Sequence, residues 1–279
     1  MWRMLFHRSL ITDHPVKWHI PRVHQHFASH RLPKSRGRML NMKNSIVVIP
    51  TYNEKENIQS LIEQIVGSGM QMRILVVDDA SPDGTGEAVE QLKSKYPEQI
   101  FCLHRPGKCG FASAYIDGFK KALSMPEIEY IFSMDADFSH NPSSLPRILE
   151  SLKQADVVVG SRYMNGTVSV VNWPIERLIL SRAANLYAQC VTGLMVSDCT
   201  SGFIGYRRGV LEKINLDKIV SDGYSFLIEL KYLAQKAGFR LSEVPIIFEE
   251  RRLGQSKMSK RIIFEALFVV WKIRFKGLT

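Results

Sequence analysis

Two aspartates one residue apart, Asp135 and Asp137, are the residues of this chain whose type and spacing best suit catalysis. They follow an apolar run at 130–134 that has the composition of a buried strand. Side chains two positions apart on an extended segment point the same way, so the two carboxylates would repel each other unless a cation lay between them. Mg²⁺ or Mn²⁺ bound by carboxylates and substrate phosphates meets this need. The pair alone would more simply be a polar turn that caps the next helix, so its interpretation depends on the motifs around it.

The surrounding segments alternate between two patterns that would position these carboxylates. Continuously apolar strands separated by helices predict an α/β fold with a mostly parallel sheet covered on both faces. In such sheets, ligands bind beyond the carboxyl ends of the strands. The sequence predicts strands at 46–49, 74–77, 100–103, 130–134 and 157–159, and helices at 54–66, 84–95, 111–123 and 142–154.

Polar residues stand at the carboxyl end of each predicted strand, so we expect them to meet at one edge of the sheet. They are residues 51–54, 78–79, 104–105, 135–137 and 161–162. The first strand leads into Pro-Thr-Tyr-Asn-Glu instead of a G-x-G-x-x-G turn, and Gly107-Lys108 lacks the spacing of a P-loop. A Rossmann dinucleotide site and a P-loop are therefore excluded.

The second half of the chain carries a long predicted helix at 173–194 and a closing helix at 260–276. Arg177 and Ser181 are four residues apart on the first of these and share a face. The closing helix is apolar nearly all the way round, so it needs to be covered. A lipid headgroup layer, a partner subunit's transmembrane helices or the domain itself would serve, because no run is long enough to span a bilayer.

The formal charge of +10 is concentrated at the two ends of the chain. Residues 1–42 hold eight Lys/Arg against one acid, Asp13, and the tail from Arg251 holds eight against Glu265. A nucleic-acid-binding domain would carry such charge across a folded face, so we expect a membrane surface or bound phosphates as partners and no nucleic acid. Residues 1–42 are interpreted as a disordered, His-rich extension without a catalytic role. The four cysteines form no Cys-x-x-Cys pair, which predicts reduced thiols and no zinc site.

Nine short motifs, taken in order, resemble glycosyltransferase family 2 of the GT-A type, and within it the dolichol-phosphate (polyprenol-phosphate) mannosyltransferases. The resemblance covers about residues 43–260, and the later motifs are the more specific to the lipid-phosphate branch. It implies a GT-A domain at 43–258. The apolar pattern that follows assigns residues 259–279 to an amphipathic, membrane- or partner-facing helix. The motifs are residues 48–54, 77–85, 105–110, 135–142, 160–163, 181–185, 198–203, 223–226 and 251–257.

The resemblance also implies a role for individual residues. Asp135 and Asp137 would hold Mg²⁺ or Mn²⁺, and together with Arg162 and Arg251 they would be the catalytic residues. Arg162, Arg177 and Ser181 would bind the acceptor's phosphate. The sugar nucleotide would contact Pro50, Tyr52, Glu54, Val77, Asp79, Lys108, Asp135, Ala136, Asp137, Arg251 and Lys257, the last two closing over the diphosphate.

The activity implied is the transfer of mannose from GDP-mannose to dolichyl or polyprenyl monophosphate. A phosphate acceptor is already an anion, so the absence of an evident general base fits this reaction. The protein would be cytoplasmic and peripheral on the cytosolic face of a membrane, with small transmembrane subunits as further candidate partners. Three alternatives stay open: the same acceptor with UDP-glucose or another UDP-sugar, a family 2 enzyme of surface polysaccharide synthesis, and an inactive sugar-nucleotide-binding scaffold.

Overall fold

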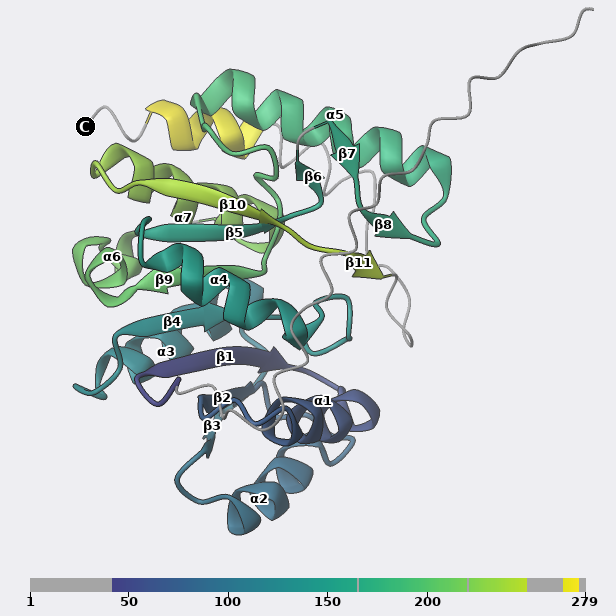
Figure 1. Cartoon of the computed structure of the whole chain (residues 1–279), viewed down its shortest axis with the longest axis vertical. Helices are drawn as coiled ribbons and strands as arrows, with labels where there is room; N and C mark the ends of the chain where they lie inside the picture. Colours follow the sequence, from purple (N-terminus) through teal and green to yellow (C-terminus); the bar gives the residue numbers. More distant parts are fainter. Residues whose placement is uncertain (1–41, 165, 220, 250–267, 276–279) are drawn as a thin grey trace, which may run out of the picture. The chain divides into compact units, whose positions relative to one another are not determined.

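The computed structural model describes residues 42–164, 166–219, 221–249 and 268–275 (Figure 1). The chain divides into two units, 1–36 and 37–279, and every described residue belongs to the second. The predicted extension therefore lies outside the described residues except for Met42, which is buried in the core. Arg251 and Lys257 also lie outside the described residues.

One central sheet organises the second unit. β9 is antiparallel to its neighbours β4 and β5, and all other pairs in the sheet are parallel, so the prediction of a mostly parallel sheet is confirmed. The strand order is β10 (Leu241–Pro245), β5 (Val157–Ser161), β9 (Ile204–Arg207), β4 (Tyr130–Ser133), β1 (Ser45–Thr51), β2 (Arg73–Asp78) and β3 (Ile100–His104).

Strand β9 was not predicted from the sequence, because its four residues include a glycine and show no strand-like run. The glycine has a packing reason. A Cβ on Gly205 would lie 2.6 Å from the Ile148 side chain and 2.9 Å from the Leu152 side chain. Gly205 therefore lets the helix that carries both residues pack closely on the middle of the sheet.

Helices cover both faces of this sheet, as the apolar strands predict. Successive residues of β1 alternate between two separate cores: Ile46 and Val48 enter one, Val47 and Ile49 the other. Figure 1 places α4 in front of the sheet and α3 and α7 behind it. The helices are α1 (Lys55–Gly67), α2 (Thr85–Lys95), α3 (Phe111–Leu123), α4 (Leu145–Leu152), α5 (Ile175–Thr192), α6 (Arg208–Lys213) and α7 (Gly223–Lys236), with 3₁₀ turns at Pro142–Ser144 and Leu216–Lys218.

Strands β1 to β5 all run in one direction, so their carboxyl ends gather at one edge, as predicted. Beyond this edge the chain forms two small two-stranded sheets. One pairs β6 (Tyr163–Met164) with β7 (Thr167–Val168), and the other pairs β8 (Val170–Val171) with β11 (Phe248–Glu249). Both adjoin the loops that carry the polar motifs.

The described part of the predicted closing helix is residues 268–275. Val270 and Ile273 on its inner side are buried in the core behind the sheet, and the Tyr232 hydroxyl lies 3.4 Å from the Arg274 carbonyl oxygen. Its outer side carries exposed aromatic residues. The domain thus covers one side of this helix and leaves the other open. Among the described helices, none is both long enough and apolar enough to cross a bilayer.

Candidate functional site

Asp135 and Asp137 lie in the turn that follows β4, not on the strand itself. The sequence argument that strand alternation turns both carboxylates to one side is therefore wrong. The loop, which passes through the left-handed region at Phe138 (φ 63°), positions them instead. The Asp137 side chain is buried, whereas the Asp135 side chain is 34% exposed. One carboxylate is thus anchored in the fold and the other reaches toward solvent.

Hydroxyl groups orient both carboxylates. The Tyr115 hydroxyl donates to Asp135 Oδ1 at 3.1 Å, and the Ser139 hydroxyl donates to Asp137 Oδ1 at 2.6 Å. Burial, together with the charge of Asp135, raises the pKa of Tyr115 well above its usual value, so this phenol remains a donor at working pH. Two carboxylates held in this way supply hard oxygen ligands, which fit Mg²⁺ or Mn²⁺.

His140 binds the backbone of the same turn. Its Nδ1 accepts a hydrogen bond from the Asp135 backbone N–H at 3.1 Å, which places the imidazole proton on Nε2. The ring is buried between Phe203, which it stacks against at 5.0 Å between centroids, and Phe248, which it meets edge-on at 5.7 Å. His140 therefore fixes the backbone of Asp135, a role that the sequence did not predict.

The predicted nucleotide residues come together at the ends of β1 and β2. The Asn53 N–H donates to Ser81 Oγ at 3.0 Å, and the Glu54 N–H donates to Thr85 Oγ1 at 3.0 Å. These bonds tie the loop that carries Tyr52 and Glu54 to the loop after β2. Lys108 Nζ, from the loop after β3, lies 4.0 Å from the centre of the Tyr52 ring, within cation–π distance.

Pro50 and Val77 are register partners on β1 and β2 at the base of this region. The Val77 side chain is fully buried in the core behind the sheet. The Val77 side chain is therefore not accessible to a nucleotide. Ala136, between the two aspartates, is also buried, so its side chain is not accessible to a nucleotide either.

Asp79 is paired with a cation that the sequence did not predict as its partner. Arg105 Nη1 donates to Asp79 Oδ1, while its Nε and Nη2 donate to Asp117 Oδ2 at 2.9 Å and Ser113 Oγ at 2.8 Å. Burial acts to lower the pKa of Arg105, but the hydrogen bond and charge of Asp79 raise it above the ordinary value. Arg105 thereby fixes the Asp79 carboxylate, whose Oδ2 makes no hydrogen bond to any described residue.

Arg162, predicted to bind an acceptor phosphate, is buried and paired with Asp198. Its Nε and Nη2 donate to the two Asp198 carboxylate oxygens at 2.7 Å each, and Nη2 also donates to Thr200 Oγ1 at 2.8 Å. Burial acts against both charges, but the pairing raises the pKa of Arg162 and lowers that of Asp198. Within the described part of the chain, only Nη1 of this guanidinium is left without a hydrogen bond. Arg162 can therefore present that one edge to a ligand, in place of the bidentate clamp expected from the sequence.

The other predicted acceptor residues converge on the same place. The Arg177 guanidinium lies 4.1 Å from the centre of the Trp173 ring, and that of Arg162 lies 5.5 Å from it. Ser181 Oγ accepts a hydrogen bond from the Tyr163 hydroxyl at 2.8 Å. Trp173 Nε1 is buried without a hydrogen-bond partner among the described residues. Two guanidinium groups around an aromatic centre make this region suited to an anion.

Asp135 and Arg162 both adjoin a single short loop, residues 198–202. Thr200 bonds to Arg162, and two positions further on a Cβ at Gly202 would lie 3.8 Å from Asp135 Oδ1. Residues two apart along a chain are separated by at most about 7 Å between Cα atoms. Asp135 and Arg162 are therefore connected through this one short loop.

A fully buried amine holds this loop in place. Lys231 Nζ, on α7, donates to the carbonyl oxygens of Cys199 at 3.0 Å, Ser201 at 2.8 Å and Leu227 at 3.2 Å. Burial lowers the pKa of Lys231 to about 8, although the negative charge of Asp198 opposes this shift. Nothing in the sequence distinguished this lysine from an exposed one, because its helix contains other polar residues.

Comparison with known proteins identifies the family. The model of the family described as Glycosyl transferase family 2 matches residues 46–215. The chain belongs to this family. It is 44% identical over 235 residues to a polyprenol monophosphomannose synthase of Mycolicibacterium smegmatis, which covers 83% of this chain and 88% of that protein. It is 41% identical over 237 residues to an undecaprenyl-phosphate mannosyltransferase of Micrococcus luteus, which covers 84% of this chain and 96% of that protein.

Solved structures agree on the fold. Glucosyl-3-phosphoglycerate synthase of Mycobacterium tuberculosis, crystallised with Mn²⁺, UDP and glucosyl-3-phosphoglycerate, superposes with a TM-score of 0.57 at 16% identity. The match covers 84% of this chain and 79% of that one. The predicted GT-A fold is therefore confirmed, and the resemblance seen in the sequence motifs is confirmed at the level of the family.

Proposed function

We propose that this family 2 enzyme transfers mannose from GDP-mannose to dolichyl or another polyprenyl monophosphate, giving a β-linked polyprenyl phosphate mannose. The observation that carries the proposal is the loop at 198–202, which Asp135 and Arg162 both adjoin. A divalent-metal site and an anion site on one loop are what a transfer between two phosphorylated substrates requires. The names of the two relatives, a polyprenol monophosphomannose synthase and an undecaprenyl-phosphate mannosyltransferase, support the choice of mannose as the sugar and of a polyprenyl phosphate as the acceptor.

On the donor side, Asp135 and Asp137 would hold Mg²⁺ or Mn²⁺, with Tyr115 and Ser139 fixing the orientation of the carboxylates. The metal would supply charge neutralisation for the leaving diphosphate. Asp79 Oδ2 would accept a hydrogen bond from the base, and a guanine edge offers adjacent N–H donors. Tyr52, Glu54 and Lys108 would line the nucleoside and diphosphate, and Arg251 and Lys257 would close over the diphosphate.

On the acceptor side, Arg162 Nη1, Arg177 and Ser181 would bind the lipid's phosphate. One phosphate oxygen attacks the anomeric carbon of mannose, the bond from that carbon to the diphosphate oxygen breaks, and GDP leaves with the electron pair. No proton is transferred, so no general base is needed. A single displacement converts the α-linked donor into a β-linked product. Catalysis then comes from positioning and electrostatic stabilisation by fixed charges.

A donor panel tests this proposal. Purified protein is incubated with radiolabelled GDP-mannose, UDP-glucose or UDP-N-acetylglucosamine and a polyprenyl phosphate, with and without EDTA. The expected result is a labelled lipid from GDP-mannose alone, lost with EDTA and restored by excess Mg²⁺ or Mn²⁺. Transfer from a UDP-sugar in place of GDP-mannose, or transfer that EDTA leaves unchanged, would contradict the proposal.

We also propose that the protein works as a peripheral protein on the cytosolic face of a membrane. All four cysteines are free, which is compatible with a reducing compartment. The acceptor is itself a membrane lipid, so the enzyme must reach the membrane surface to bind it.

A further inference from the structure

Helix α2 and strand β3 bring three side chains that can bind a metal to one place. Cys102 and His104 are two positions apart on β3, so they point to the same face of the sheet. Helix α2 packs against this face and carries Glu90. The Cys102 sulfur, a ring nitrogen of His104 and a carboxylate oxygen of Glu90 all lie within 4.8 Å of one another.

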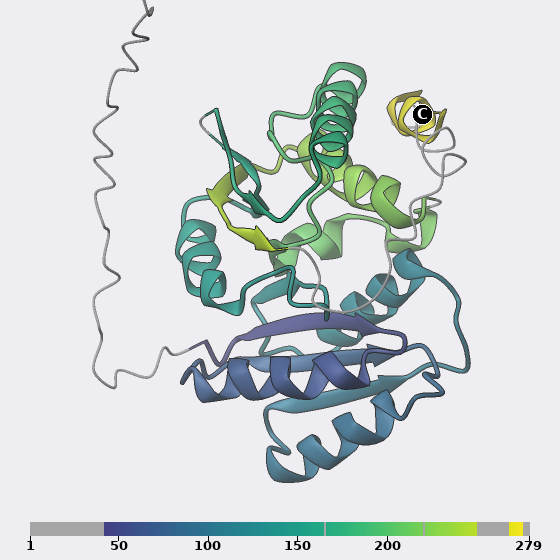
Figure 2. The same cartoon turned by 90° about the vertical axis from the view of Figure 1, so that its right-hand side faces the viewer.

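This cluster is separate from the Asp135 and Asp137 carboxylates and from the acceptor residues on α5. Strand β3 is at the edge of the sheet, and β1 and β2 lie between it and β4. At about 4.8 Å between neighbouring strands, β3 is roughly 14 Å from β4. Figures 1 and 2 both place α2 and β3 at the lower end of the molecule, with α5 at the upper end.

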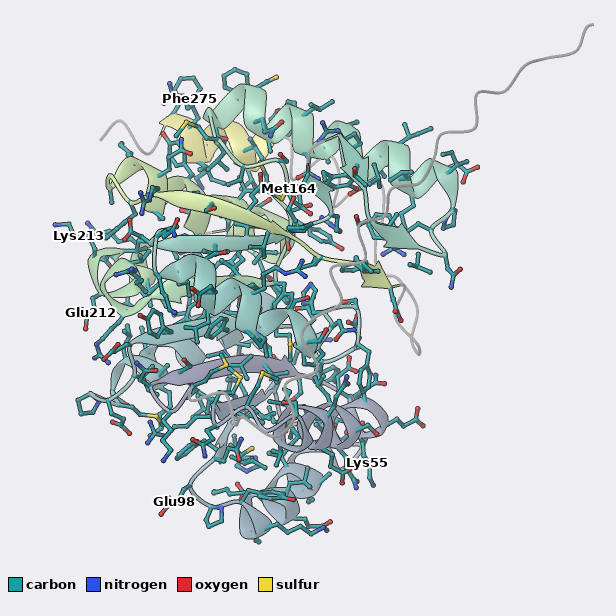
Figure 3. The ribbon with its side chains drawn as sticks, viewed as in Figure 1. Lys55, Glu98, Met164, Glu212, Lys213 and Phe275 are labelled. Carbon is teal, nitrogen blue, oxygen red and sulfur yellow. The ribbon has the colours of Figure 1, made fainter. Side chains whose placement is uncertain are left out.

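The local packing leaves room for the imidazole ring and keeps the cluster open to water. A Cβ on Gly86 of α2 would lie 3.0 Å from His104 Cε1, so a larger residue there would push the ring away. The side chains of His104 and Glu90 are 52% and 40% exposed, which lets an ion and water reach them. Figure 3 shows the labelled Glu98, in the turn that joins α2 to β3, extending outward, so Glu90 is the acid that faces the ring.

We propose that Glu90, Cys102 and His104 bind one Zn²⁺ ion, with water completing its coordination. Thiolate sulfur, imidazole nitrogen and carboxylate oxygen are the ligands that Zn²⁺ takes in proteins, and at bond lengths of about 2.0–2.3 Å they lie roughly 3.5 Å apart around a tetrahedral ion. Small side-chain rotations within the present 4.8 Å would bring the three ligand atoms to that spacing. Mg²⁺ and Mn²⁺ prefer oxygen ligands, so they suit the two aspartates after β4 instead.

The charges around Cys102 attract a dication and at the same time keep the thiol protonated in its absence. Burial raises the pKa of Cys102 to about 12, and the negative charges of Glu90 and Asp78 add to this effect. When the bond from sulfur to Zn²⁺ forms, the thiol proton leaves to solvent. The sequence predicted no zinc site, because zinc ligands are recognised in a sequence by close pairs such as Cys-x-x-Cys, whereas here the third ligand comes from a different element.

Lys93 competes with the ion for Glu90. Its Nζ donates to both Glu90 carboxylate oxygens, at 3.1 Å and 3.0 Å, and its positive charge repels a dication. At least one of these oxygens must therefore be released when Zn²⁺ binds. Removing the ammonium group with Lys93→Met should strengthen binding several-fold, which would not be expected of an ion bound elsewhere on the surface.

A bound Zn²⁺ would join α2 to the carboxyl end of β3. His104 directly precedes Arg105, whose guanidinium fixes the Asp79 carboxylate. The ion would thus hold the strand end from which the nucleotide loop with Lys108 begins. Because the three ligands are assembled only in the folded chain, the ion would also add its binding free energy to the stability of this edge of the sheet.

The test is a titration of the metal-free, reduced protein with Co²⁺, which takes the place of Zn²⁺ and absorbs light. Co²⁺ bound to a thiolate has a charge-transfer band in the near ultraviolet that Co²⁺ bound only to nitrogen and oxygen lacks. Residues 1–41 contain histidines but no cysteine, so ions bound there, or at Asp135 and Asp137, do not contribute to the band. We expect one equivalent of Co²⁺ to produce the band and one equivalent of Zn²⁺ to abolish it.

Variants assign the band to this cluster. Cys102→Ser should abolish it, and Glu90→Gln, a change at a half-exposed residue that leaves the fold intact, should weaken Co²⁺ binding by at least about 10-fold, the lower end of the cost of losing even an outer-shell partner. The matched control is Cys190→Ser, which changes an exposed cysteine on α5 and should keep the wild-type band and affinity. Zn²⁺ should raise the melting temperature of wild type and of the control more than that of Cys102→Ser.

Three results would overturn the inference. The first is a wild-type protein that shows no thiolate band in excess Co²⁺. The second is a band that Cys102→Ser retains or that Cys190→Ser removes, because another cysteine would then bind the ion. The third is an affinity for Co²⁺ that neither Glu90→Gln nor Lys93→Met changes. None of these measurements uses mannosyl transfer, so the zinc site and the proposed function stand or fall separately.

Discussion

Replacing Asp198 with Asn tests the pairing that positions the acceptor arginine. Arg162 and Asp198 are both buried, and the carboxylate accepts bonds from Arg162 Nε and Nη2 at 2.7 Å each and from its backbone N–H at 3.0 Å. Asn would keep the shape but leave a buried guanidinium without a counter-charge. Breaking a buried pair in this way costs about 3–5 kcal/mol of unfolding free energy. At roughly 2–4 °C per kcal/mol for a domain of this size, the melting temperature should fall by about 6–20 °C.

A matched double variant separates the structural part of this effect from the catalytic part. Arg162→Met combined with Asp198→Leu removes both charges, and replacing a whole buried pair by apolar residues is often neutral or stabilising. We expect the double variant to recover most of the melting temperature lost by Asp198→Asn, measured by calorimetry. Transfer to polyprenyl phosphate should nevertheless remain at least about 100-fold below wild type, the scale of losing one transition-state contact. A double variant that recovers stability and turnover together would refute the role given to Arg162.

Three further predictions follow from particular contacts. Tyr115→Phe removes one donor to Asp135 and should raise the Mn²⁺ concentration needed for half-maximal activity by about 10–100-fold. The control is Tyr206→Phe, which removes a buried hydroxyl without a partner among the described residues and should leave that Mn²⁺ concentration unchanged. The pKa of Lys231 is lowered from 10.5 to about 8 in the folded protein, so between these pH values the unfolded chain binds one more proton than the folded one. As the pH rises from 8 to 10.5, the free energy of unfolding of wild type should therefore increase by roughly 3 kcal/mol relative to that of Lys231→Met. Denaturant titrations in which both proteins show the same pH dependence of stability would contradict this. A chain that starts at Met42, which keeps that buried residue, should have wild-type turnover, and an inactive one would show that residues 1–41 are needed.

The sequence predicted the frame of the fold because its signals are local. Apolar β-branched runs such as that of β1, and helical spacing such as that of α3, are set by residues adjacent in the chain. The gathering of polar loops at one edge then follows from the parallel sheet alone. Strand β9 escaped prediction because its place is decided by distant packing, with Gly205 lying under Ile148 and Leu152.

The candidate site likewise has a part that the sequence could predict and a part that it could not. Its outline was predictable, since Asp135 and Arg162 stand in recognisable motifs and Arg177 lies one helical turn from Ser181. The partners that orient them were not, because Tyr115, Asp198 and His140 are separated from their targets by turns or whole elements. A physical signal did exist for Asp198, since an arginine that is buried needs a carboxylate nearby. The sequence could not indicate that Arg162 was buried, so that signal could not be used.

The central claim is that the carboxylates after β4 and the guanidinium beside the 198–202 loop serve one metal-assisted transfer. The most direct measurement is the steady-state rate of Asp137→Asn as Mn²⁺ is titrated, with GDP-mannose saturating and polyprenyl phosphate varied. We expect turnover to fall by about 100- to 1000-fold, as for the loss of a key electrostatic contact, while the KM for the lipid phosphate stays near the wild-type value. Turnover in Asp137→Asn close to wild type, with an unchanged dependence on Mn²⁺, would contradict the claim.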